Sequence, residues 1–362
     1  MLKLRLAEDI MGKNIYERLA GGDKMIRIKD IAKEAGVSAT TVSNVIHGNT
    51  RKVSKETIEK IQKLLEKYSY IPSMGAVMLA GNSSHLIGVL IGGRKTKIEH
   101  SIFVDEMIRE LEYQLYKRNY YMIVHYTDSV NESLKFAATW AVEGLITLTI
   151  SEDDTWEIYK KCNVPLVSVD VYYQDGHEVP NVGTADYKGG YLMGEYLLRQ
   201  GLQRITFFSD NDVGVDNQRW KGLEAACRDG GYPLEKARHI LLNECKAERR
   251  NFYREHMERI ARESDALFYA SDYYAMEGIV LLNSIGLSVP EDISVAGFDD
   301  SEFARMSCPE LTTIHQSIKQ KAVATAEKMF CYLRGDKNVL MCEELPVSLK
   351  IRESVKMNKK EE

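Results

Sequence analysis

The sequence lacks the patterns that mark several large protein classes. It has no apolar run long enough to span a membrane, and residues 1–24 lack the apolar core and cleavage site of a signal peptide. Its six cysteines are scattered, without C-x-x-C or His/Cys spacing. We therefore expect free thiols, no bound metal, no membrane partner and a cytoplasmic location.

Motifs of catalysis and of cofactor binding are also missing. The chain has no G-x-S-x-G and no G-x-x-x-x-G-K-S/T. Gly92 and Gly93 follow an apolar run but lack the third glycine and the acidic ribose partner of a dinucleotide site. We expect no cofactor and no enzymatic activity, which leaves binding as the chemistry to explain.

Charge is distributed unevenly along the chain. The net charge is −5 overall, yet residues 25–80 carry nine Lys/Arg and only five Asp/Glu. The rest of the chain is acidic. A basic head on an acidic body predicts that only the head meets a polyanion.

Residues 28–46 predict two short helices separated by a tight turn. Ile31 and Ala35 lie one helical turn apart, and Gly36 supplies the permissive backbone that ends the first helix. Ser38 can cap the second helix.

The second of these helices has two different faces. Val42, Val45 and Ile46 form an apolar stripe, while the other face carries short side chains and no acidic residue. Such a face suits close approach to phosphates and base edges, as in a helix-turn-helix recognition helix. An ordinary helical hairpin with a polar face is the alternative.

The same residues follow the pattern I-K-D-V/I-A-x-x-A-G-V-S-x-x-T-V-S-x-V-L/I, which residues 53–57 and 70–73 continue. This stretch resembles the DNA-binding headpiece of the LacI/GalR family of bacterial transcription regulators. The resemblance implies base contacts at Ala39, Thr40 and Asn44, and we expect phosphate contacts from Ser38, Thr41, Ser43 and the loop at His47. Of the base-reading positions only Thr40 and Asn44 can hydrogen-bond a base edge, so we expect modest direct readout.

Residues 73–81 match the hinge of that family, a short helix that forms on DNA. Leu79 stands at the place of the leucine that each subunit of a dimer inserts into the minor groove. Val77 replaces the usual arginine, and Gly75 lowers helix propensity by about 1 kcal/mol relative to alanine. We therefore expect the hinge helix to form less readily. An unstructured linker is the alternative interpretation of this segment.

From residue 86 onward, short apolar runs alternate with amphipathic helices. This alternation predicts parallel sheets with right-handed crossovers, in two sets that form two lobes with a cleft between them. The expected strands are 86–91, 121–125, 144–150, 165–171, 205–209, 267–270 and 293–298. The pattern is similar to the periplasmic-binding-protein fold of the family's effector domain. The crossovers of that fold imply that residues 311–316 and the helix after them return toward the first lobe. A strand near 345–351 should end in the second.

The expected fold is thus a small all-α helix-turn-helix headpiece followed by a two-lobed α/β domain. Its segments are an extension (1–24, non-native or disordered), the headpiece (25–71), a hinge helix and linker (72–85), the effector-binding and dimerisation domain (86–355) and a charged tail (356–362). Met25 is the hypothesised native start, because residues 20–25 can be encoded by a ribosome-binding sequence and a start codon. A genuine short helix is the alternative for the extension.

Ligand sites in open α/β sheets lie beyond the carboxyl ends of the strands. This rule selects the aspartates that follow expected strands: Asp170, Asp210, Asp272, Asp299 and Asp300. The resemblance implies that Asp299, in a V-P-x-D-I-S-V-x-G-F-D-D match, accepts hydrogen bonds from sugar hydroxyls. It also implies that Arg219, in an R-x-x-G match, contacts the effector, and that Phe103 offers an apolar face to a sugar ring.

Each of these residues also has a structural interpretation. Asp299 and Asp272 could cap the segments that follow them, Arg219 could form a surface ion pair, and Phe103 could belong to the core. Val171, Tyr187 and Ser271 stand where the family usually has arginine or asparagine. This indicates a bulkier or less polar effector, such as an oligosaccharide or glycoside.

These observations predict a sequence-specific DNA-binding repressor that acts as a homodimer on a double-stranded operator and responds to a sugar-like effector. The effector-binding residues expected are Phe103, Asp170, Arg219, Asp272 and Asp299. The alternatives are a sugar-binding protein of an importer, against which the basic head argues, and a less favoured α/β sugar-metabolising enzyme.

Overall fold

The computed structural model describes residues 26–46, 48, 50–70, 83–93, 102–173, 176–232, 238–336 and 338–358. The chain forms two compact units, Met1–Ser84 and His85–Glu362. The predictions for residues 1–24, for His47 and for the hinge residue Leu79 lie outside the described residues.

The first unit is a small helical domain with its own apolar core. Its helices are α3 (Ile28–Ala35), α4 (Ala39–Ile46) and α5 (Lys55–Lys67), with a 3-10 turn, η1, at Thr50–Lys52. Gly36 ends α3 in the left-handed conformation at φ +72°, as the turn requires. The buried core consists of Ile31, Ala32, Ala35, Val42, Val45 and Ile61. The predicted helix-turn-helix is confirmed.

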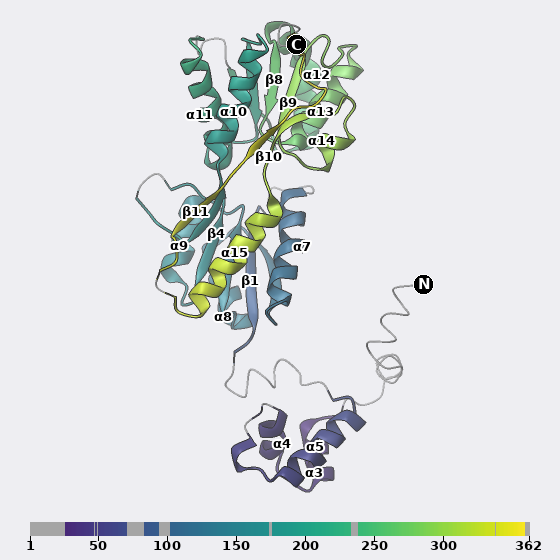
Figure 1. Ribbon diagram of the computed structural model, residues 1–362, viewed down its shortest axis with the longest axis vertical. Helices are drawn as coiled ribbons and strands as arrows, with labels where there is room; N and C mark the ends of the chain where they lie inside the picture. The colour runs from purple at the N-terminus through teal and green to yellow at the C-terminus, as the bar shows by residue number, and fades with distance from the viewer. Residues whose placement is uncertain are drawn as a thin grey trace. The chain divides into compact units, whose positions relative to one another are not determined.

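The second unit contains two six-stranded sheets, each in its own lobe (Figure 1). The first sheet is wholly parallel, in the order β11-β5-β4-β3-β1-β2. Its strands are β1 (Leu86–Gly92), β2 (Tyr121–Thr127), β3 (Gly144–Leu148), β4 (Leu166–Val169), β5 (Asn181–Thr184) and β11 (Cys342–Leu345). Its helices are α7 (Ile102–Tyr116), α8 (Val130–Trp140), α9 (Glu152–Lys161) and α15 (Ile318–Leu333).

The second sheet has the order β12-β10-β9-β8-β6-β7 and is parallel except for β12. Its strands are β6 (Ile205–Ser209), β7 (Arg238–Leu241), β8 (Ala266–Tyr269), β9 (Ser294–Asp299), β10 (Thr312–His315) and β12 (Ser348–Lys350). Its helices are α10 (Asp186–Arg199), α11 (Gly214–Asp229), α12 (Lys246–Glu263), α13 (Asp272–Ser284) and α14 (Glu302–Met306).

The chain passes between the lobes three times. It leaves the first lobe between β5 and α10, returns between β10 and α15, and crosses again between β11 and β12. The predicted two-lobed α/β fold is therefore confirmed, and helix α15 returns to the first lobe as predicted. The predicted return of residues 311–316 is wrong, because Thr312–His315 form β10 of the second sheet. Strands β5, β7 and β11 are not predicted by the sequence pattern.

Helices α10 and α11 approach each other unusually closely at the first crossing. A Cβ atom built on Gly190 would lie 2.0 Å from the carbonyl oxygen of Arg219, and one on Gly222 would lie 2.0 Å from that of Tyr187. Only glycine permits this backbone contact. The contact brings Arg219 next to the first turn of α10.

Replacing Gly190 with alanine tests whether this contact matters. We expect Gly190→Ala to lower the free energy of unfolding by about 1–3 kcal/mol, because the added methyl group forces the helices apart. The exposed Lys221→Ala on α11 is the matched control and should stay within about 0.5 kcal/mol of the parent chain. Equal stability of the two variants in urea titrations would contradict the close packing.

Candidate functional site

The predicted base-reading residues Thr40 and Asn44 lie on the side of α4 opposite its buried valines, whereas Ala39 packs against the headpiece core. Ser38 caps this helix, since its Oγ accepts a hydrogen bond from the Thr41 N–H at 3.1 Å. Ser38 and Thr40 are exposed, while Val42 and Val45 are buried in the headpiece core. The remaining predicted contacts are partly exposed: Ala39, Thr41, Ser43 and Asn44.

Several side chains on this face are free to bind another molecule. Among the described residues, the side chains of Thr40, Ser43 and Asn44 have no hydrogen-bond partner. The exposed Arg51 and Lys52 of η1 add positive charge to the same unit. Helix α4 can therefore offer hydroxyl and amide groups to DNA without an opposing carboxylate.

The second candidate site lies where the strands of both lobes end. Asp170 directly follows β4 at φ +57°, and Asp299 is the last residue of β9 at φ +118°. Neither conformation is favourable for a residue with a Cβ atom. Backbone strain of this kind is concentrated at functional sites, which makes the strand ends a candidate for ligand binding.

A buried lysine joins two predicted residues of the first lobe. Lys321 of α15 donates to both carboxylate oxygens of Asp170, at 2.7 and 2.6 Å, and to Gln316 Oε1 at 2.8 Å. Its ammonium group lies 5.0 Å from the centre of the Phe103 ring. Burial raises the pKa of Asp170, and the ammonium group opposes this effect.

Arg219 is the corresponding buried cation of the second lobe. Its Nε donates to Asp186 Oδ1 at 2.7 Å and its Nη1 to the Ala270 carbonyl at 2.6 Å. The guanidinium group stacks 3.7 Å above the Phe298 ring. Burial alone would lower the pKa of Arg219, but the nearby carboxylates raise it above its usual value.

Gln316 connects the two halves at the second crossing. Its Nε2 donates to Asp299 Oδ1 at 2.6 Å, while its Oε1 accepts from Lys321 and from Thr184 Oγ1 at 3.0 Å. Burial raises the pKa of Asp299 to about 6, and the positive charge of Arg219 opposes this increase. Polar groups from both lobes thus form one connected network.

The other aspartates that follow strands are engaged within the second lobe. Asp272 is fully buried and accepts hydrogen bonds from Thr313 Oγ1 at 2.6 Å and from the Ser301 N–H at 2.8 Å. Burial raises its pKa well above the usual value. Asp300 pairs with Arg352, Arg305 and His315. The structure brings Phe103, Asp170, Arg219 and Asp299 into the network and gives Asp272 a packing role beside it.

The network also contains residues that the sequence analysis did not select. Gln316 directly follows β10, so the strand-end rule could have found it. Asp186 receives Arg219 on one oxygen and the Tyr172 hydroxyl on the other, at 2.5 Å. Lys321 had no signal in the sequence, because a lysine on a helix is ordinarily exposed.

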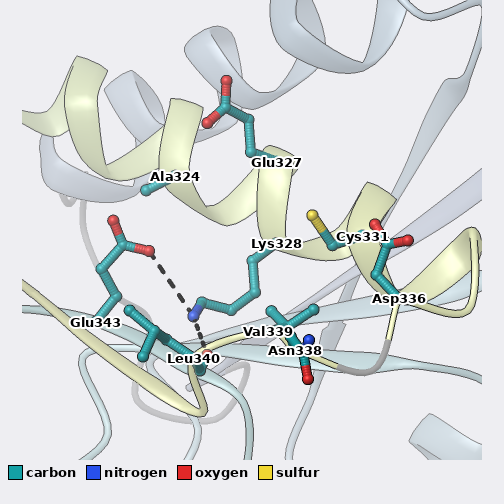
Figure 2. A pocket seen from close by; sticks show the side chains of 9 residues that line it. All are labelled: Ala324, Glu327, Lys328, Cys331, Asp336, Asn338, Val339, Leu340 and Glu343. Atoms are coloured by element: carbon teal, nitrogen blue, oxygen red, sulfur yellow. Dashed lines mark hydrogen bonds and ion pairs between the residues drawn. The ribbon is translucent and has the colours of Figure 1, made fainter.

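Two cavities lie away from these residues. The larger, about 510 Å³, lies between the outer face of α15 and the segment before β11, with Lys328 between Leu340 and Glu343 (Figure 2). The smaller, about 160 Å³, lies at the carboxyl ends of β1, β2 and β3 and is lined by Thr127 and Thr149 among others. Only the smaller one is at the sheet edge where a ligand was predicted.

Each of the two units of the chain matches a known protein family. Residues 27–73 match the family described as bacterial regulatory proteins, lacI family, and residues 195–355 match a periplasmic binding protein-like domain. The HTH-type transcriptional repressor PurR of Haemophilus influenzae (strain PittEE) is 31% identical over 303 residues, which cover 81% of this chain and 87% of the repressor. The chain belongs to the LacI family of bacterial regulatory proteins.

Other relatives of this LacI-family chain extend the match. PurR of Actinobacillus pleuropneumoniae is 28% identical over 86% of this chain and 93% of that repressor. The fold is that of a lac repressor dimer bound to operator and the anti-inducer ONPF, with a TM-score of 0.78, 24% identity and coverage of 91% of this chain and 99% of that one. The chain is a DNA-binding transcription regulator of the repressor class, and the importer and enzyme alternatives are not favoured.

Two classes of feature are absent from the described part of the chain. No helix there is long and apolar enough to cross a membrane. No group of His, Cys, Asp and Glu side chains among the described residues could hold a metal ion.

The raised pKa of Asp299 predicts how stability depends on pH. A carboxyl group with a higher pKa in the folded than in the unfolded chain costs stability as pH rises between the two values. Asp299→Asn keeps the acceptor for Gln316 but cannot ionise. We therefore expect this variant to be more stable than the parent chain at pH 7.5 and equally stable at pH 4, by urea unfolding.

The exposed Asp212→Asn is the control and should change nothing at either pH. A loss of stability in Asp299→Asn at pH 7.5 would show that the ionised carboxylate stabilises the fold.

Proposed function

We propose that this LacI-family chain is a cytoplasmic repressor that binds a near-palindromic operator as a homodimer and responds to a sugar-like effector at the lobe junction. The observation that carries the proposal is the combination of the two units. A headpiece with free polar groups on α4 precedes a two-lobed unit whose strand ends share one polar network.

The headpiece supplies the DNA contacts in this proposal. Thr40 and Asn44 face base edges in the major groove, and the hydroxyls of Ser38, Thr41 and Ser43 bind phosphates. Leu79, outside the described residues, enters the minor groove. One short recognition helix offers few contacts, so useful affinity requires two half-sites held by a symmetric dimer.

Exposed aromatic side chains support a dimer through the first lobe. Strand β2 is an edge strand with Tyr121 59% and Tyr126 42% exposed, and α7 presents Tyr116 at 63%. Such patches on an unpaired edge mark protein interfaces. The lac repressor structure that shares this fold is a dimer on its operator.

The lobe junction supplies the effector response. Structures with the same fold contain cellobiose, in the regulator CelR, and ribose, in a LacI family regulator from Enterococcus faecium. An effector held by Asp170, Arg219 and Asp299 contacts groups of both lobes. It shifts DNA affinity only if it binds one arrangement of the lobes more tightly than the other. The hinge would then pass between ordered and disordered states.

Asn44→Ala tests the recognition helix. We expect it to weaken binding to the operator by about 1–3 kcal/mol, because the amide that reads a base edge is lost. Binding to unrelated DNA should change little. Gln62→Ala removes an exposed amide from α5 and serves as the control in fluorescence anisotropy at fixed salt.

A selection experiment can refute the DNA-binding proposal directly. Salt-sensitive selection of operator DNA from a random library should succeed with the parent chain. If no sequence is enriched over non-specific binding, the proposal is wrong.

Asp299→Ala tests the effector site. We expect the variant to bind operator normally and to lose its response to the sugar that releases or recruits the parent chain, because the carboxylate that orients the ligand is gone. Asp212→Ala removes an exposed carboxylate near the end of β6 and should respond like the parent. An unchanged response of Asp299→Ala in operator-release assays refutes the assignment.

A further inference from the structure

The carboxylates at the lobe junction differ in whether the protein itself neutralises them. Asp170 binds Lys321 through both oxygens, and Asp186 binds Arg219. Both cations are almost completely buried, at 1% and 7% side-chain exposure. These two ion pairs are complete without a ligand.

Asp299 has no ion-pair partner of this kind among the described residues. Its one hydrogen bond is from the neutral amide of Gln316 to Oδ1, and Oδ2 has no partner in the described part of the chain. The side chain is partly exposed at the end of β9. Asp299 is therefore the carboxylate of the network that a ligand can reach and neutralise.

The two cations already hold carboxylates of the protein. The three protons of the Lys321 ammonium group are taken by Asp170 and Gln316. Arg219 uses Nε and Nη1 within the protein, and its Nη2 has no hydrogen-bond partner among the described residues. A phosphate or carboxylate that took Lys321 from Asp170 would leave that carboxylate uncompensated, which is strongly unfavourable.

The neighbouring edge of the first lobe is also acidic. The smaller cavity, at the ends of β1, β2 and β3, is lined by Asp128 and Asp154, by hydroxyl and backbone groups, and by no Lys or Arg among the described residues. Both described parts of the strand-end region thus carry more negative than positive side chains.

We propose that the effector is a sugar that carries a protonated amino group, and that this ammonium group binds Asp299. The inference rests on the proposed function, since it names the ligand class of the same site. A sugar hydroxyl can also donate a hydrogen bond to Asp299. An ammonium group in addition brings a positive charge to a carboxylate that forms no ion pair among the described residues, and charge-assisted hydrogen bonds are the stronger ones.

Binding of such a ligand depends on the ionisation of Asp299. Because burial holds the pKa of Asp299 near 6, the carboxylate is ionised at pH 7 and largely protonated at pH 5. The charged groups that face it are Arg219 on α11, Asp186 on α10, Asp272 on α13 and Lys321 on α15. We expect affinity for the amino sugar to fall about tenfold between pH 7 and pH 5.

The test is calorimetric titration of the full-length chain with matched sugars. The probes are D-glucosamine, D-galactosamine and D-mannosamine, each beside its N-acetyl derivative, its parent hexose and the hexose 6-phosphate. We expect at least one amine to bind about tenfold more tightly than its three analogues. Asp299→Asn, which keeps the shape of the side chain, should abolish this preference, with its fold checked by thermal unfolding.

Three outcomes would overturn the inference. Tightest binding of a parent hexose or N-acetyl sugar would assign Asp299 to hydroxyl recognition and leave the proposed function intact. Tightest binding of a hexose 6-phosphate would show that the site recognises an anion and not an ammonium group. Binding of no sugar also overturns it, and operator binding of the same preparation then decides the proposed function separately.

Discussion

The architecture of the lobe junction depends on the buried ion pair between Arg219 and Asp186. Asp186 begins α10 just after the chain leaves the first lobe, and Arg219 reaches it from α11 at 2.7 Å. The pair forms because Gly190 and Gly222 let the two helices approach to backbone contact. A larger residue at either glycine would move the guanidinium group away from Asp186 and from Asp299 together.

The second crossing extends this constraint into the first lobe. Gln316 binds Asp299 on one side and Lys321 on the other, and Lys321 in turn holds Asp170. A ligand that changes the partners of Asp299 therefore acts on a chain of hydrogen bonds that spans both lobes. In this fold the crossing segments both connect the lobes and carry the polar groups of the site.

The site is costly to the fold, as expected of a binding site. Asp170 and Asp299 have left-handed backbone conformations, and burial raises the pKa of both carboxyl groups. Asp300 shows the opposite case, since Arg352 and Arg305 outweigh its burial and lower its pKa. Adjacent aspartates in one motif thus differ, since Asp300 is held by ion pairs of the protein and Asp299 belongs to the proposed ligand site.

Most of the fold could be predicted from the sequence because buried parallel strands are continuous apolar runs, as in β1 and β6. Strands β7 and β11 could not, since edge strands are half exposed and β11 contains Glu343 and Glu344. Aspartates at strand ends were predictable from the strands alone. Lys321 was not, because its burial depends on Asp170, which lies 151 residues earlier in the chain.

The central claim is that one buried ion pair organises the junction that carries the proposed effector-binding groups. A double-mutant cycle on the free energy of unfolding tests it most directly, with Arg219→Met, Asp186→Asn and the double variant. Each single change should cost about 3–5 kcal/mol, since it leaves a buried charge unpaired, and the double variant should cost clearly less than the sum. Strict additivity of the two changes would contradict the claim.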